Sequence, residues 1–90
     1  MAAVVRKEVL EALSDAETRG VKRVRVIIGL RGPDSLEPVK NALHSMGVKA
    51  VVRETEDLLA VNLSREEIRR VGRLKEHVKA IWLDRPVSAA

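Results

Sequence analysis

The spacing of hydrophobic residues predicts three amphipathic helices. The first covers residues 4–18, and Gly20 is expected to end it because glycine readily adopts the left-handed conformation of a helix C-terminus. The second is expected to begin at Asp34, with Glu37 as its capping partner, and the third at Ser64, which a glutamate also follows three residues later. The residues expected to face the core are Val5, Val9, Ala12, Leu13 and Ala16, then Leu36, Val39, Leu43 and Met46, then Ile68, Val71 and Leu74.

Between these helices, β-branched residues and period-two alternation predict strands. They are expected at residues 22–30, 48–54, 58–63 and 78–84. After the opening helix the order is strand, helix, strand, strand, helix, strand, which predicts an α+β fold. This is the ferredoxin-like βαββαβ sandwich, with a four-stranded antiparallel sheet and two helices on one face. The expected parts are an N-terminal helical extension (1–20), the ferredoxin-like domain (21–84) and a C-terminal tail (85–90).

The predicted strands carry apolar residues on both faces. In the first strand, Val26 and Ile28 alternate with Ile27, and in the third, Leu59 alternates with Leu58. A sheet face in water normally carries polar residues. We therefore expect the second face to be covered either by the opening helix or by a partner protein.

Composition and charge exclude several classes of function. Trp82 is the only aromatic residue, so the central strands lack the stacking aromatics of a nucleic-acid-binding sheet. The 17 basic and 13 acidic residues leave a net charge of +4 that is spread along the chain, which argues against a nucleic-acid partner. The absence of cysteine excludes disulfides and cysteine-type zinc sites. Charged residues reach 33% while glutamine is absent, a composition typical of heat-adapted proteins.

The sequence offers little for catalysis, cofactors or metals. His44 and His77 stand in no ligand-spacing motif, and the segment 29–32 lacks the lysine of a phosphate-binding loop. The acidic segment 54–57 does not match a calcium loop and is expected to form a turn. We therefore expect a non-enzymatic protein without cofactor or metal. The apolar runs are too short for a membrane span, so no membrane partner is expected.

The final segment, LKEHVKAIWLDRPVSAA at residues 74–90, resembles the closing segment of subtilisin-like serine protease propeptides and of related stand-alone protease inhibitors. In that family a helix ending in leucine is followed by a short turn, an alternating strand, an acidic residue and a short tail. The resemblance extends back through residues 59–64 and the helix after them to residues 25–28. It covers about residues 22–90, and the opening helix lies outside it.

The resemblance implies a role as a protease inhibitor and as an intramolecular chaperone for protease folding. The partner would be a subtilisin-like serine protease, bound in cis as a precursor or in trans. The sheet face opposite the two later helices would pack on two surface helices of the protease, and Asp84 would accept N–H groups at a partner helix N-terminus. The tail that would enter the active-site cleft consists of Pro86, Val87, Ser88, Ala89 and Ala90.

Two functions from other classes remain open at this stage. A ligand-sensing regulatory domain of the same topology would form a dimer that binds an amino acid, and a basic nucleic-acid-binding module would bind RNA or DNA in a salt-dependent way. The start of the chain lacks the apolar region of a signal peptide. Localisation stays open, because this fits both a protein whose signal peptide has been removed and a protein that never had one. An extracellular location is expected if a signal peptide has been removed from a propeptide, and a cytoplasmic one if the chain is complete.

Overall fold

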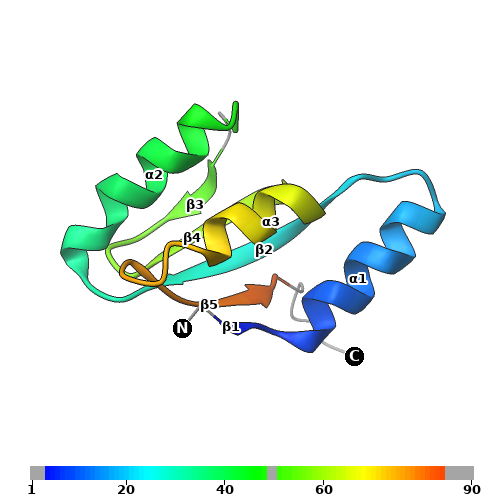
Figure 1. The fold of residues 1–90 in the computed structure, drawn as a ribbon, viewed down its shortest axis with the longest axis horizontal. Helices are drawn as coiled ribbons and strands as arrows, with labels where there is room; N and C mark the ends of the chain where they lie inside the picture. The colour runs from blue at the N-terminus through cyan, green and yellow to red at the C-terminus, as the bar shows by residue number, and fades with distance from the viewer. Residues whose placement is uncertain (1–3, 49–50, 85–90) are drawn as a thin grey trace.

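The computed structural model describes residues 4–48 and 51–84, which form one five-stranded sheet in the order β1-β5-β2-β4-β3 (Figure 1). The strands are β1 (Val4–Val5), β2 (Arg23–Leu30), β3 (Val51–Glu54), β4 (Leu58–Ser64) and β5 (Val78–Leu83). The helices are α1 (Lys7–Thr18), α2 (Leu36–Ser45) and α3 (Arg65–Gly72), and a 3₁₀ helix, η1 (Pro33–Ser35), precedes α2. Strand β2 pairs antiparallel with β4 and β5, and β3 pairs antiparallel with β4.

The expected α+β, ferredoxin-like arrangement with an extra N-terminal helix is confirmed. One addition is strand β1, which pairs parallel with the edge of β5, so the opening segment is not helical from residue 4 as expected. The N–H of Arg6 donates to the carbonyl of Ile81 at 3.0 Å, and α1 begins only at Lys7. Among the helices of the described part of the chain, none is long and apolar enough to cross a membrane.

All three helices cover the same face of the sheet. The fully buried side chains Val26, Ile28 and Leu30 of β2 belong to one core cluster with residues of every helix. The helical members of this cluster are Val9 and Leu13 of α1, Val39 and Leu43 of α2, and Ile68 and Val71 of α3. Helix α1 is also linked to α3 by an ion pair of 2.8 Å between Arg65 and Glu17. The opening helix α1 therefore extends the layer formed by α2 and α3 and does not cover the opposite face of the sheet (Figure 1).

The local signals at the helix ends are confirmed in two cases and wrong in one. Ser64 and Glu67 form the expected reciprocal capping box, and Gly20 follows α1 in the left-handed conformation, with φ of 81°. Asp34 does not cap the second helix, because it lies inside η1 and α2 begins at Leu36 without a side-chain cap. The physical reason is the preceding Pro33, whose ring fixes φ near its helical value and favours an early turn.

Glu67 also joins α3 to the start of β2, which predicts an acid-sensitive contribution to stability. Its carboxylate accepts hydrogen bonds from Arg23 Nε and Nη2, both at 3.1 Å, and from the Ser64 N–H at 2.8 Å. The hydrogen bonds from Arg23 are the main reason that the pKa of Glu67 lies below its ordinary value of 4.5. A carboxyl group with a lowered pKa in the folded state stabilises the fold above its unfolded-state pKa, and this stabilisation is lost as the pH falls through the folded-state pKa.

We expect Glu67→Gln to lower the free energy of unfolding by about 1 kcal/mol at neutral pH, because Arg23 is largely exposed and its pairing is screened by water. The difference from the unmodified chain should shrink as the pH falls below 4.5. Urea unfolding followed by circular dichroism across this pH range measures both effects. Glu66→Gln is the matched control, since Glu66 is exposed and its ion pairs with described residues are those with its helix neighbours Arg69 and Arg70. An equal, pH-independent loss in both variants would contradict the prediction.

Candidate protein-binding face

The side of the sheet opposite the helices is a continuous surface, which we call the helix-free face. In β2, its positions alternate with the buried Val26 and Ile28, and strand pairing places the corresponding residues of β4 and β5 beside them. The helix-free face comprises Arg25, Ile27 and Gly29 of β2, Leu58, Ala60 and Asn62 of β4, Lys79, Ala80 and Trp82 of β5, and Arg53 of β3.

An apolar band runs across the centre of this face. Trp82, Ile27 and Ala60 are direct neighbours on β5, β2 and β4, and Leu58 lies in the next row beside Gly29. Ala60 is buried, whereas Ile27, Leu58 and Trp82 remain half-buried. The accessible apolar surface therefore comes from three large side chains on three adjacent strands. Such a surface is typical of a sheet face that is covered by another layer of structure or by a partner protein.

Gly29 determines how the Trp82 side chain lies on the sheet. A Cβ atom built on Gly29 would overlap the six-membered ring of Trp82, and it would lie 3.4 Å from Cε of Lys79. The indole therefore extends diagonally over the backbone of β2, a reach that is within the span of an aromatic side chain. Sequence reasoning placed Gly29 in the expected strand 22–30 but missed this contact, because the contact joins two strands that only the fold brings together. The available signal was an isolated glycine at the end of an alternating strand pattern.

Three cations surround the apolar band. Arg25 lies two residues before Ile27 on β2, Arg53 lies opposite Ala60 on β3, and Lys79 lies beside Gly29 at a bulge of β5. All three are exposed, and within the described residues none of them forms a salt bridge. The face therefore combines an apolar centre with a basic edge.

Asp84 lies at one corner of this face. Its N–H donates to the carbonyl of Arg25 at 3.1 Å, which continues the pairing of β5 with β2 by one residue. The residue is half-buried and directly follows β5, which ends at Leu83. The other predicted site residues, Pro86, Val87, Ser88, Ala89 and Ala90, lie outside the described residues.

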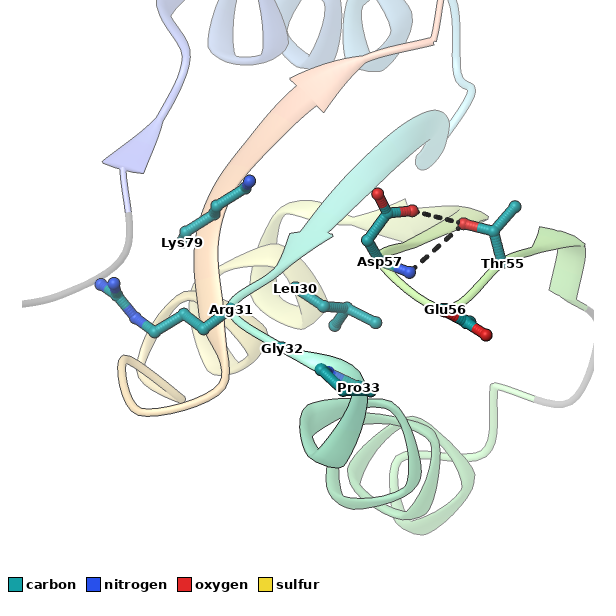
Figure 2. Close-up of a pocket in the computed structure, with 8 residues that line it drawn as sticks. All are labelled: Leu30, Arg31, Gly32, Pro33, Thr55, Glu56, Asp57 and Lys79. Atoms are coloured by element: carbon teal, nitrogen blue, oxygen red, sulfur yellow. Dashed lines mark hydrogen bonds between the residues drawn. The ribbon is translucent and has the colours of Figure 1, made fainter.

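A separate hollow of about 410 Å³ lies at the end of the sheet where β2 leads into η1 (Figure 2). It is lined by Leu30, Arg31, Gly32, Pro33, Thr55, Glu56, Asp57 and Lys79. Several of its polar groups are engaged in holding the loops: Thr55 Oγ1 donates to the Asp57 carboxylate at 2.8 Å, and Arg31 Nε donates to the Lys75 carbonyl at 2.6 Å. Figure 2 shows the Arg31 side chain directed away from the Thr55–Asp57 turn.

The described residues offer no cluster of metal ligands, and one of the two histidines has a structural partner. No group of three or more histidine, aspartate or glutamate side chains in residues 4–48 and 51–84 is arranged to hold a metal ion. His77 Nδ1 lies 3.2 Å from Ser35 Oγ, which ties the segment before β5 to η1. The helix-free face is therefore the strongest candidate for a functional site.

Comparison with known proteins gives no assignment for this chain. No protein-family model matches it, and neither the curated proteins nor the solved structures give a match. Function is therefore inferred from the surface of the sheet and from the resemblance of the final segment.

Proposed function

We propose that this protein is a propeptide-like domain that binds a subtilisin-like serine protease and is not itself an enzyme. The observation that carries the proposal is the helix-free face, where Ile27, Leu58 and Trp82 stay accessible although three helices are available to cover the sheet. Burying this apolar band against a partner supplies a hydrophobic driving force. The known family resembled by residues 22–90 uses the corresponding face to dock on its protease.

The proposed inhibition uses the end of the chain together with this face. Asp84 directly follows β5 and lies at a corner of the helix-free face, where its carboxylate is available to accept N–H groups at the N-terminus of a partner helix. The tail from Pro86 to Ala90 enters the cleft as an added strand, with Val87 in an apolar pocket and the Ala90 carboxylate beside the catalytic serine. The sheet contact holds the tail near the cleft, so that local release of the tail does not free the enzyme.

We expect the full chain to inhibit a matching subtilisin-like protease at micromolar concentration, and deletion of residues 87–90 to weaken that inhibition by about 100-fold or more, because the cleft contact is lost. Hydrolysis of a chromogenic peptide measures inhibition, and fluorescence anisotropy of a labelled domain measures binding. Arg69→Ala, on the exposed side of α3, is the matched control. Inhibition that is unchanged by the deletion would contradict the tail mechanism, and absence of both binding and inhibition would contradict the function.

The same contact supports a chaperone role. A large protease domain with long-range strand pairing folds slowly, and a preformed sheet can stabilise its docking helices before the rest of the core forms. We expect a denatured protease to recover several-fold more activity when it is refolded with the domain than without it. The measurement is the yield of active protease after release of the domain by limited proteolysis. Equal yields would rule out this role while leaving inhibition possible.

A further inference from the structure

The charged side chains on the two sides of the sheet differ in whether they form salt bridges. The described salt bridges involve residues of the helices: Arg19 with Asp15, Arg23 with Glu67, Lys40 with Glu54, Arg65 with Glu17, and Arg69 and Arg70 with Glu66. The three cations of the helix-free face, Arg25, Arg53 and Lys79, take part in none of the salt bridges that the described residues form. Their charges are therefore available to a partner.

From this distribution we infer that the partner surface carries carboxylate side chains around an apolar strip, and that these carboxylates meet Arg25, Arg53 and Lys79. The inference rests on the proposed function, because it specifies the chemistry of the protease surface that docks on the helix-free face. The apolar strip packs on Ile27 and Trp82, while the carboxylates lie over the basic edge.

The positions of the cations fit such a surface. Arg25 and Arg53 lie one step from the apolar row in two different directions, along β2 and across to β3, and Lys79 lies on the far side beside Gly29. Within the described part of this face, Asp84 is the one carboxylate in the strand rows, opposite Arg25 at a corner. Glu56 and Asp57 stand beyond the rows, in the turn that lines the hollow with Lys79. The three cations outnumber the single carboxylate within the rows, which leaves the face basic.

A protein fits this face better than a nucleic acid does. Sheets that bind single-stranded nucleic acid stack bases on aromatic side chains of their central strands. Here β2 and β4 present Ile27, Gly29, Leu58 and Ala60, and the single tryptophan, Trp82 of β5, reaches over Gly29 with its six-membered ring. Aliphatic side chains gain from contact with another apolar surface, whereas phosphate groups would have to lose water beside them.

Charge complementarity of this kind accelerates encounter more than it tightens the final complex. Opposite charges around a contact surface steer two proteins toward the correct orientation, and salt weakens the steering because the Debye length falls to about 10 Å at 0.1 M ionic strength. The contribution of the three cations is therefore measured best by the association rate of the domain with its protease.

The test compares two triple charge reversals in the full chain. One variant carries Arg25→Glu, Arg53→Glu and Lys79→Glu on the helix-free face, and the other carries Arg69→Glu, Arg70→Glu and Arg73→Glu on the helical side. Both change the net charge equally and differ in where the charge lies; the second also removes the exposed ion pairs of Arg69 and Arg70 with Glu66. Stopped-flow association with an acidic subtilisin-like protease should be slowed about tenfold or more by the first variant at low salt, and about threefold or less by the second. High salt should bring all three proteins to similar rates.

A milder variant with Gln at positions 25, 53 and 79 keeps the inference testable if the reversed variant folds poorly, and it should slow association by an intermediate factor. Equal slowing by both reversals, or no slowing by either, would overturn the acidic-partner inference while leaving the protease function intact. Failure of the unmodified chain to bind any subtilisin-like protease would overturn both. Tight binding of a single-stranded polyuridine oligonucleotide, lost in the first variant, would assign the three cations to a nucleic acid instead.

Discussion

Truncation of Ile28 to alanine is expected to lower the free energy of unfolding by about 3 to 4 kcal/mol, whereas the same change at the adjacent Ile27 should lower it by about 1 kcal/mol. The two residues are neighbours in β2 but face opposite sides of the sheet. Ile28 is fully buried in the cluster beneath the helices, so its truncation leaves a cavity. Ile27 is half-buried on the helix-free face, where the loss of its outer atoms leaves no enclosed space.

Urea unfolding followed by circular dichroism measures these differences, and for a domain of this size each 1 kcal/mol corresponds to about 4–8 °C in Tm. Protease binding should show the opposite order of effects, with the larger loss of affinity in the Ile27 variant, because Ile27 lies in the proposed contact and Ile28 does not. Ile27→Ala should weaken binding about tenfold or more, and Ile28→Ala should change it little at a temperature where the variant is folded. Similar stability losses in both variants would show that the two faces are equally enclosed.

The second large effect concerns Gly29. Replacement of Gly29 by alanine should lower the free energy of unfolding by about 2 kcal/mol, because the new Cβ overlaps the Trp82 ring and forces the indole out of its place. Gly32→Ala is the matched control: Gly32 has an extended backbone with φ of −171°, and nothing lies within 4 Å of an added Cβ. That change should leave stability nearly unaltered.

Trp82 provides a direct readout, since it is the only tryptophan in the chain. Its fluorescence should shift to longer wavelength in Gly29→Ala and stay unchanged in Gly32→Ala. Combining Gly29→Ala with Trp82→Ala should remove most of the penalty of the glycine substitution, because the clashing ring is then absent. A penalty that persists in the double variant would mean that the backbone of β2, and not the indole, requires glycine.

Much of the fold could be predicted because its signals are local. The capping box at Ser64 and Glu67 joins residues three positions apart, and the left-handed Gly20 ends α1 through its own backbone. The alternation in β2 likewise separates Ile27 from Ile28 without reference to any other strand. The last strand was predicted at residues 78–84 for the same reason, and in the structure β5 ends at Leu83, directly before Asp84.

The sequence could not determine where the opening helix packs. Its stripe of Val9, Leu13 and Ala16 would fit either apolar face of the sheet, and the choice depends on contacts such as Arg65 with Glu17, which lie 48 residues apart. Strand β1 escaped prediction because two residues are too short for a pattern and pair with Ile81 and its neighbour only through the tertiary structure. The overlap of Trp82 with Gly29 is likewise a contact between paired strands.

The amino-acid sequence by itself determined the three helices, the four strands from β2 to β5, their order along the chain and the two-sided apolar character of the sheet, since each follows from the repeat of side chains along one element. Tertiary structure alone decided that all three helices cover one side, and that an apolar band with a basic edge stays accessible on the other. The physical reason is that burial depends on which surfaces meet, and these surfaces are built from residues far apart in the chain.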